Sequence, residues 1–389
     1  MISVEEALAR IFALVTPLPS EPVPLRAAAG RVLAAPVIAP RDQPPFSASA
    51  MDGYAVQGPV SPGQSFTVVG ESAAGRASGL SVAPGQAVRI FTGAPLPDGA
   101  DRVIIQEDTT RDGTTITLSD KLDEATHVRP AGGDFKVGDR LEPGRLLTPN
   151  ALALAAAMGA ATVTCTRKPI VALMATGDEL VMPGEAPGPD QIVASNSFAL
   201  AALFEAEGAE SRLLPIARDT RESLTAAFNL ARGADLVVTT GGASVGDHDL
   251  VGEVAAEFGM DRAFYKVAMR PGKPLMAGRV LDMAMVGLPG NPVSSIVCGH
   301  IFIRPMIRKM LGLGEAPAPR RSLPLNAPLP ANGPRAHYMR GVISEGSISA
   351  FERQDSSLLS LLDSANALLL RPPNDGPRAP GEMVEVIDL

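Results

Sequence analysis

The fold of the central region is predicted most directly from the stretch Asp235-Leu-Val-Val-Thr-Thr-Gly-Gly-Ala-Ser-Val-Gly-Asp-His-Asp249. Its apolar, β-branched first half is typical of a buried strand, and the abrupt change to glycine, serine and carboxylate predicts a ligand loop at the strand end. The paired glycines lack a Cβ, so a polar or anionic group could approach the peptide N–H groups closely. The candidate ligand contacts in this loop are Gly241, Gly242, Ser244, Gly246, Asp247 and Asp249.

Two other stretches repeat this plan. The apolar run 169–175 changes into Thr176-Gly-Asp-Glu179, and the run 283–288 changes into Pro289-Gly-Asn-Pro-Val-Ser-Ser295 at the start of an apolar helix. Ligands of an open parallel sheet bind outside the carboxyl ends of its strands, so we expect the three loops to converge on one site. The further candidates are Gly177, Asp178, Glu179, Pro289, Gly290, Asn291, Pro292 and Ser294.

Composition restricts the class of protein. A chain of 389 residues predicts two to four domains. A net charge of −8 argues against a nucleic-acid partner and against binding to an anionic membrane. Two cysteines make no disulfide framework and favour a reduced, cytoplasmic setting. The sequence starts without a signal-peptide pattern, and its most apolar stretch is too short to span a bilayer.

The first half of the chain changes pattern twice. A capping box at Ser3 and Glu6 predicts a helix to about Val15, whereas the prolines of 17–45 favour an extended limb with at most a short helix at 27–33. Short alternating runs between Gly63 and Leu141 predict a small inserted β domain. A helix is expected at 147–158.

The second half predicts a multidomain α/β fold. Strands that alternate with helices at 196–207, 221–232 and after Pro292 indicate a doubly wound central domain, and short strands after Gly314 predict a C-terminal β barrel. We therefore expect an extended linking domain at 1–45 and 139–168, an inserted β-rich domain at 46–138, a central α/β domain at 169–318 and a β barrel at 319–389.

Anion and metal chemistry has its own candidates. Lys266, Arg270 and Lys273 lie within eight residues of an acidic chain and predict an anion site, although a solvated basic loop is the usual explanation of such a cluster. No His or Cys spacing suits zinc, whereas Glu179 and Asp249 could share Mg²⁺. Asp219 is an alternative ligand or only a helix cap.

Two regions of the inserted domain carry further candidates. Asp52 stands among small residues, where it could approach a ligand or simply cap its own turn. Arg129, near paired glycines, could bind an anion, although surface arginines beside turns are common. Thr92 and Asp134 lie in the same two polar loops of interest, 91–97 and 127–134.

Taken together, the motifs resemble those of the MoeA family, molybdopterin molybdenumtransferases related to the E domain of gephyrin. The resemblance covers nearly the whole chain in the right order and is carried by the stretches 49–55, 91–97, 176–179, 240–249, 270–274 and 287–294.

The resemblance implies an elongated, four-domain homodimer that cleaves adenylylated molybdopterin with Mg²⁺, inserts molybdate and releases AMP and molybdenum cofactor. The adenylyltransferase of the pathway and acceptor molybdoenzymes would be its protein partners. By motif, the functional positions are Asp52, Thr92, Arg129, Asp134, Glu179, Asp219, Asp249, Lys266, Arg270, Pro289 and Pro292. The first four would reach the site across the dimer interface.

Two positions depart from the family pattern or extend it. Arg270 stands where many members have lysine. Ser356 lacks the glycine that is often found beside this serine in the family. The resemblance also assigns Arg340 to ligand binding. Two rival functions remain at this stage: a scaffold that binds receptor tails, as gephyrin does, and a CinA-like nucleotide pyrophosphate hydrolase. Molybdate and tungstate, which are nearly equal in size and charge, are not separated.

Overall fold

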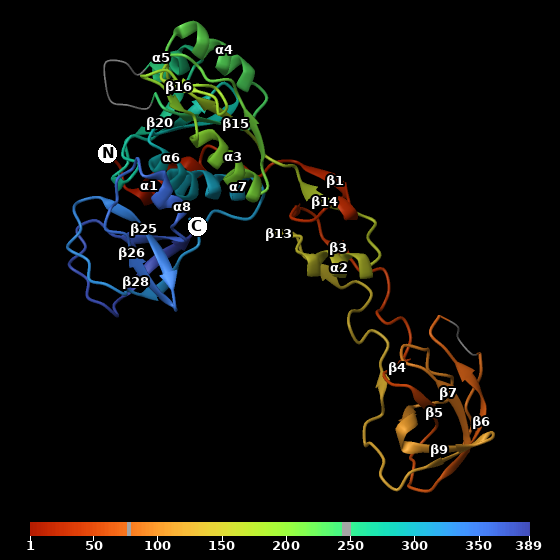
Figure 1. The fold of residues 1–389 in the computed structure, drawn as a ribbon. Helices are drawn as coiled ribbons and strands as arrows, with labels where there is room; N and C mark the ends of the chain where they lie inside the picture. Colours follow the sequence, from red (N-terminus) through yellow and green to blue (C-terminus); the bar gives the residue numbers. More distant parts are fainter. Residues whose placement is uncertain (76–78, 243–249) are drawn as a thin grey trace.

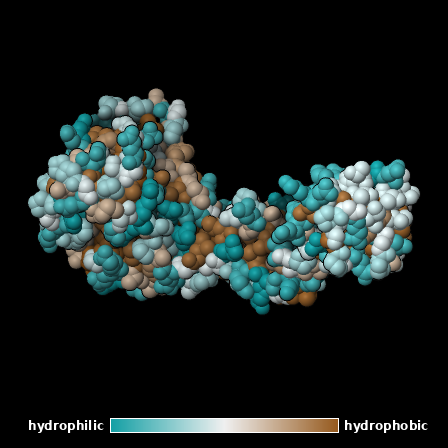
Figure 2. All heavy atoms as spheres, turned by 90° about the horizontal axis from the view of Figure 1, so that it is seen from below, coloured by the Kyte–Doolittle hydropathy of each residue, from teal (hydrophilic) through white to brown (hydrophobic). Residues whose placement is uncertain are grey.

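The structure is a computed structural model that describes residues 1–75, 79–242 and 250–389. The molecule is elongated, with a large lobe at one end, a narrow middle part and a small β domain at the other end (Figures 1 and 2). The chain starts in the large lobe, runs out to the small domain, and returns, so both termini lie in the large lobe (Figure 1). No helix within the described ranges is long and apolar enough to cross a membrane.

A six-stranded sheet forms the centre of the large lobe. Its first four strands are parallel, and the last two run antiparallel to their neighbours. The two-residue turn at Leu281 and Asp282 explains this change, because so short a connection joins only antiparallel strands. In spatial order the strands are β18 (Glu210–Leu213), β15 (Ile170–Ala175), β19 (Leu236–Thr240), β23 (Met283–Leu288), β22 (Met276–Val280) and β20 (Asp261–Tyr265).

Helices cover both faces of this sheet, which confirms the doubly wound prediction. Leu236 and Val238 pack into one core with α1 (Val4–Phe12), α3 (Asn196–Ala206), α6 (Pro292–Cys298) and α7 (Arg304–Met310). Val237, between them, packs into the opposite core with α4 (Arg221–Ala231) and α5 (Leu250–Glu257). Burial on both faces is why these strands read as continuous apolar runs.

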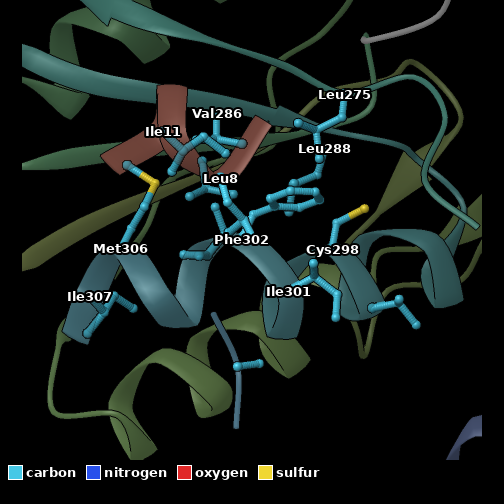
Figure 3. Close-up of a cluster of buried hydrophobic side chains, with 14 of the residues drawn as sticks. Leu8, Ile11, Leu275, Val286, Leu288, Cys298, Ile301, Phe302, Met306 and Ile307 are labelled. Carbon is cyan, nitrogen blue, oxygen red and sulfur yellow. The ribbon is translucent and has the colours of Figure 1, made fainter. Parts of the chain in front are cut away.

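The N-terminal helix α1 is part of the large lobe. Ser3 caps it as predicted, accepting a 3.1 Å bond from the Glu6 N–H. Leu8 and Ile11 lie against Phe302 and Met306 (Figure 3). Both of these residues belong to the long helical segment that starts at Pro292. A five-residue π-helix (Gly299–Ile303) joins α6 to α7 in that segment.

The middle part contains a small core of its own. Strands β1 (Ser20–Pro24), β14 (Thr162–Thr166), β2 (Val32–Leu33) and β13 (Arg145–Leu146) form one sheet, and β3 (Val37–Ile38) pairs with β12 (Arg140–Leu141). Helix α2 (Pro149–Ala157) packs onto this sheet within the predicted range. The short helix expected at 27–33 is wrong: a 3-10 turn covers Leu25–Ala27, and the next apolar pair forms β2 because its side chains fill a sheet core.

Both predicted β-rich domains, the inserted one and the C-terminal one, are present. The inserted domain has the strand order β8 (Arg102–Ile105), β5 (Gly53–Val56), β7 (Gln86–Ile90), β6 (Ser65–Ser72), β10 (Thr115–Leu118) and β9 (Thr109–Asp112), with a 3-10 turn at Gln106–Asp108. Beside it, β4 (Ala48–Ser49) pairs with β11 (Val128–Arg129).

The C-terminal domain is a small barrel. Its strands are β24 (Arg321–Pro324), β25 (Ala336–Ser344), β26 (Ser347–Ala350), β27 (Ala367–Arg371) and β28 (Met383–Asp388). The order β26-β25-β27-β28-β24 closes through a bridge between Leu325 and Ile348. A short helix, α8 (Leu359–Asp363), touches α6, and β21 (Met269–Arg270) of the central region pairs with β25, so the barrel is joined directly to the central domain.

Candidate functional site

Three of the predicted loops start from neighbouring strands. Ala175 at the end of β15 pairs with Thr240 at the end of β19, and Thr240 pairs with Leu288 at the end of β23. All three strands are parallel, so their carboxyl ends lie at one edge of the sheet. The expected convergence of the loops is therefore confirmed for the described residues. Residues 243–249, with the predicted Ser244, Gly246, Asp247 and Asp249, lie outside the described ranges.

The loop after β15 folds Glu179 back over the strand end. Gly177 has φ +146°, and a Cβ built there would lie only 2.4 Å from a Glu179 carboxylate oxygen. Only glycine leaves room for the carboxylate in this position. The same crowding applies at Gly241, where a Cβ would lie 2.6 Å from the Thr176 carbonyl oxygen.

The loop after β23 is fixed from the neighbouring helix. The side-chain amide of Asn196, at the start of α3, donates a 2.7 Å bond to the Gly290 carbonyl. Pro292 is the first residue of α6, and the Ser295 hydroxyl bonds to the Pro292 carbonyl at 3.0 Å. The backbone at the helix start is thereby held in one conformation.

These loops enclose a pocket of about 400 Å³, here called pocket A. Among the described residues, its lining combines one carboxylate with amide, hydroxyl and glycine backbone groups, and two partly exposed apolar side chains from the short strands β16 (Leu180–Val181) and β17 (Ile192–Val193). Lining residues are Thr176, Glu179, Leu180, Ile192, Asn196, Thr240, Gly241, Gly242, Pro274, Pro289, Gly290, Asn291 and Pro292.

A second pocket of about 360 Å³, pocket B, lies between the central domain and the barrel. Pro274 and Asn291 line both pockets, so the two are adjacent. Arg270, Lys273 and Arg335 line pocket B against one carboxylate, Asp355, and the pocket therefore favours anions. Its other lining residues are Met269, Pro271, Gly272, Ser294, Gln354 and Ser356.

His337 borders this basic region without adding charge at neutral pH. Its strand places it between Arg270 on β21 and Arg371 on β27. Burial first, and then the surrounding arginines, lower the pKa of His337 to about 4. The positive charge near pocket B therefore comes from arginine and lysine.

Arg340 and Lys266 have other surroundings. Arg340 is 1% exposed, and its guanidinium bonds to the Gln354 side chain and to the Asp355 carbonyl at 2.9 Å. These contacts support the loop that carries Ser356 into pocket B. The Lys266 ammonium lies 5.3 Å from the centroid of the Tyr265 ring. Ligand contacts of Arg340 and Lys266 stay predictions.

Asp219 lies beside the Glu179 loop. Its backbone N–H donates a 3.1 Å bond to the Asp178 carboxylate. Burial first, and then the charges of Asp178 and Glu179, raise the pKa of Asp219. Three carboxyl groups thus concentrate negative charge near the end of β15. Among the residues that the structure describes, no group of three or more His, Cys, Asp or Glu side chains could hold a metal ion by itself.

The four candidates of the inserted domain form a separate cluster. Asp52 accepts 2.8 Å bonds from both the N–H and the hydroxyl of Thr92, and these two bonds lower the pKa of Asp52. Arg129 and Asp134 line a pocket of about 640 Å³, pocket C, next to Gly93. Within one chain this cluster is at the far end of the molecule from pockets A and B (Figure 1).

Sequence reasoning missed several residues of these pockets. Arg335, Gln354 and Asp355 line pocket B only because the barrel docks on the central domain, and no local motif marks them. Asn196 was interpreted only as the first residue of a helix. Its side-chain amide bonds to the Gly290 carbonyl, and asparagine at a helix start is a residue type that commonly bonds to the backbone.

Comparisons with known proteins follow the same division of the chain. Residues 2–159 match the MoeA N-terminal region (domain I and II), residues 172–309 match the probable molybdopterin binding domain, and residues 322–389 match the MoeA C-terminal region (domain IV).

Full-length relatives and a solved structure agree with these matches. The chain is 36% identical to molybdopterin molybdenumtransferase 2 of Mycobacterium tuberculosis, over 94% of each chain. It is 32% identical to the Bacillus subtilis molybdopterin molybdenumtransferase, over 99% of this chain and 94% of that one. The crystal structure of a molybdopterin biosynthesis MoeA protein from Pyrococcus horikosii superposes with a TM-score of 0.85 at 29% identity, over 100% of this chain and 99% of that chain. With relatives of this identity along nearly its full length, the chain belongs to the MoeA family of molybdopterin molybdenumtransferases.

Proposed function

We propose that this chain binds adenylylated molybdopterin, cleaves it with Mg²⁺, inserts molybdate into the dithiolene and releases AMP and molybdenum-loaded molybdopterin. One observation carries this proposal: two pockets of different chemistry share Pro274 and Asn291 as a common wall. A reaction that joins a phosphorylated organic substrate to an inorganic oxyanion needs two such adjacent sites, and proximity itself lowers its barrier.

Pocket A suits the pyrophosphate and the pterin. Peptide groups at Gly241 and Gly242, beside the start of the helix that follows Pro292, can approach phosphate oxygens without a Cβ in the way. Leu180 and Ile192 add apolar surface, against which the face of a ring can pack. Asn196 keeps the Gly290 peptide in place while the ligand binds.

Pocket B suits molybdate. Arg270, Lys273 and Arg335 offer fixed positive charge to a dianion, and the hydroxyls of Ser294 and Ser356 can donate hydrogen bonds to its oxygens. Tungstate has nearly the same size and charge, so the same groups would bind it. We therefore propose molybdate as the physiological anion on the strength of the family alone.

Pocket A offers a setting for Mg²⁺. In proteins this ion takes one or two carboxylates together with substrate phosphates and water, which fits a site without a complete protein cage. Glu179 supplies one carboxylate. Burial first, and then the charges of Asp178 and Glu179, raise the pKa of Asp219, and a cation would offset the part that comes from charge. Asp249 is the second ligand that we propose. When bound, the ion would neutralise charge on the departing phosphate.

We also propose that the site is completed by a second copy of the chain. Asp52, Thr92, Arg129 and Asp134 form an organised cluster with a pocket, yet they lie far from pockets A and B along the same chain. Apolar surface on the middle part would suit a contact between copies (Figure 2). We keep the four-domain division at 1–45 with 139–168, 46–138, 169–318 and 319–389, which is supported by buried cores of their own in the middle part, the inserted domain and the barrel. Helix α1 departs from this division, because it packs into the core of the central domain.

The test uses the full-length protein with adenylylated molybdopterin, Mg²⁺ and molybdate, and follows AMP and the cofactor by chromatography. We expect one AMP for each loaded cofactor, and little AMP when the metal is chelated. Reactions without protein and without molybdate are the controls. AMP formation no faster than in the protein-free reaction would refute the proposal.

A further inference from the structure

Arg218 holds the loop that carries Glu179. One terminal nitrogen of its guanidinium donates to the carbonyl oxygens of Asp178 at 2.9 Å, Leu180 at 3.0 Å and Gly177 at 3.4 Å. These carbonyls flank Glu179 on both sides in the sequence. A contact that gathers the backbone on both sides of one residue fixes the direction in which its side chain leaves the chain.

Two more bonds join the same pair of loops. The Gly177 N–H donates to the Ala217 carbonyl at 3.1 Å, and the Asp219 N–H donates to the Asp178 carboxylate at 3.1 Å. Arg218 lies between these two contacts, in the connection from β18 to α4. The segment 217–219 therefore supports the β15 loop from outside pocket A, while Glu179 lines the inside of that pocket.

We propose that Arg218 is a positioning residue for Glu179: it sets the Glu179 carboxylate for the metal and the phosphates by holding the surrounding backbone, without touching the substrate. This inference rests on the function proposed for pocket A. Groups that orient a metal ligand from behind typically change metal affinity or activity by about 10- to 100-fold when they are replaced.

Charge and geometry can be separated at this position. Arg218→Lys keeps the positive charge but replaces a planar guanidinium with a single ammonium, whereas Arg218→Gln removes the charge. If geometry matters, both variants lose function. If Arg218 instead attracts the substrate phosphates directly, the lysine variant retains most of the activity and the glutamine variant mainly loses substrate affinity.

Arg212 offers a matched control on the same strand–helix unit. Its guanidinium also donates to backbone carbonyls, those of Arg232 at 3.1 Å and Leu230 at 3.5 Å, at the far end of α4. Arg212→Gln removes the same kind of contact without affecting the loop at 176–180. It therefore measures the general effect of losing an arginine–carbonyl contact in this domain.

Two measurements on the full-length variants test the proposal. In Arg218→Lys and Arg218→Gln, hydrogen–deuterium exchange of the peptide covering 176–181 should become faster, and the Mg²⁺ concentration for half-maximal AMP release should rise about tenfold. The molybdate concentration for half-maximal rate should not change, because pocket B is on the other side of Asn291. The Arg212→Gln control should match the wild type in all three quantities.

Several outcomes would overturn the inference. It fails if exchange at 176–181 is unchanged, if the lysine variant keeps wild-type Mg²⁺ dependence, or if Mg²⁺ and molybdate dependence rise together. The proposed function fails separately, if the wild-type protein itself releases no AMP. The exchange measurement still decides in that case whether Arg218 holds the loop.

Discussion

The side-chain amide of Asn291, at the start of α6, donates a 3.2 Å hydrogen bond to the hydroxyl of Ser356 in the barrel. A second contact runs from the Val293 N–H to the Ser356 carbonyl at 3.2 Å. Asn291 lines pockets A and B, and Ser356 lines pocket B, so this pair connects the two domains at the place where the pockets meet.

Replacement of Ser356 should affect the oxyanion more than the nucleotide. Ser356→Ala removes a hydroxyl from pocket B, and we expect the molybdate concentration for half-maximal rate to rise about tenfold, or roughly 1.4 kcal/mol. Ser364→Ala, at the exposed end of α8, is the control. Steady-state AMP release at varied molybdate measures the effect, and an unchanged molybdate dependence would remove Ser356 from the site.

Lys273 should contribute mainly through charge. It is one of three cations lining pocket B, so Lys273→Ala should weaken anion binding, and the difference from wild type should shrink as salt is raised. Titration calorimetry with molybdate at two ionic strengths measures this. Lys168→Ala, an exposed lysine outside the pockets, should leave affinity unchanged. Equal affinities of Lys273→Ala and wild type at low salt would contradict the assignment of pocket B.

Glu179 should matter for the rate of AMP release more than for binding. Glu179→Gln preserves size but removes the carboxylate charge that we propose for the metal, and an effect on the transition state appears in the chemical step. Single-turnover AMP release at saturating Mg²⁺ should slow by at least about tenfold. Glu185→Gln, an exposed acid four residues after β16, is the matched control. A near wild-type rate for Glu179→Gln would contradict the metal assignment.

Much of this arrangement could be predicted from the sequence because it depends on local patterns. The runs ending at Ala175, Thr240 and Leu288 are strands with both faces buried. The Glu179 carboxylate of the same loop requires Gly177, whereas the Thr176 carbonyl of the neighbouring loop requires Gly241. Helix α5 was missed because it is short and contains Gly252, and α8 because it has only five residues.

Long-range packing set the limits of that prediction. Nothing local at Arg335 shows that it reaches pocket B, since its place depends on how the barrel docks against β21. Arg340 was assigned to the ligand by resemblance, whereas its observed bonds hold the 354–358 loop. Strand β22 runs antiparallel to β23 because a two-residue turn joins them, which the apolar runs themselves do not reveal.

A buried ion pair should dominate the acid stability of the barrel. Bonds from Arg378 first, and then from Arg371, lower the pKa of Asp375, and the Arg371 side chain is 3% exposed. A lowered pKa stabilises the fold above the unfolded value of about 3.9, and this contribution is lost as pH falls through the folded value. Asp375→Asn leaves Arg371 buried without its carboxylate partner and should cost roughly 3 kcal/mol at pH 7.

Hydrogen exchange of the 321–389 peptides in urea measures the stability of the barrel separately from the other domains. The difference between wild type and Asp375→Asn should be full at pH 7 and should shrink below about pH 4. Asp388→Asn, which breaks the exposed ion pair with Arg321, should leave the urea midpoint of barrel unfolding unchanged. An Asp375→Asn barrel as stable as wild type at pH 7 would contradict this role.

Sharing of the site between two copies can be tested by mixing variants. Asp52→Ala damages the inserted-domain cluster, and Glu179→Ala damages pocket A. If each site combines pocket A of one copy with the inserted-domain cluster of the other, a mixed dimer has one site with both parts intact and one with neither. Random exchange makes about half of the dimers mixed, so a 1:1 mixture should recover about one quarter of wild-type AMP release.

The control mixes Asp52→Ala with Asp134→Ala, both in the inserted domain. Every inserted domain in that mixture is defective, so no site is intact and no activity should return. Native mass spectrometry must show mixed dimers in both cases, because exchange is required for the comparison. If mixed dimers form and the first mixture stays inactive, each chain must build its site alone. The inserted-domain cluster and pocket A lie far apart in one chain, so such a site would require a large movement of the middle part. Wild-type protein that stays monomeric while turning over substrate would refute sharing directly.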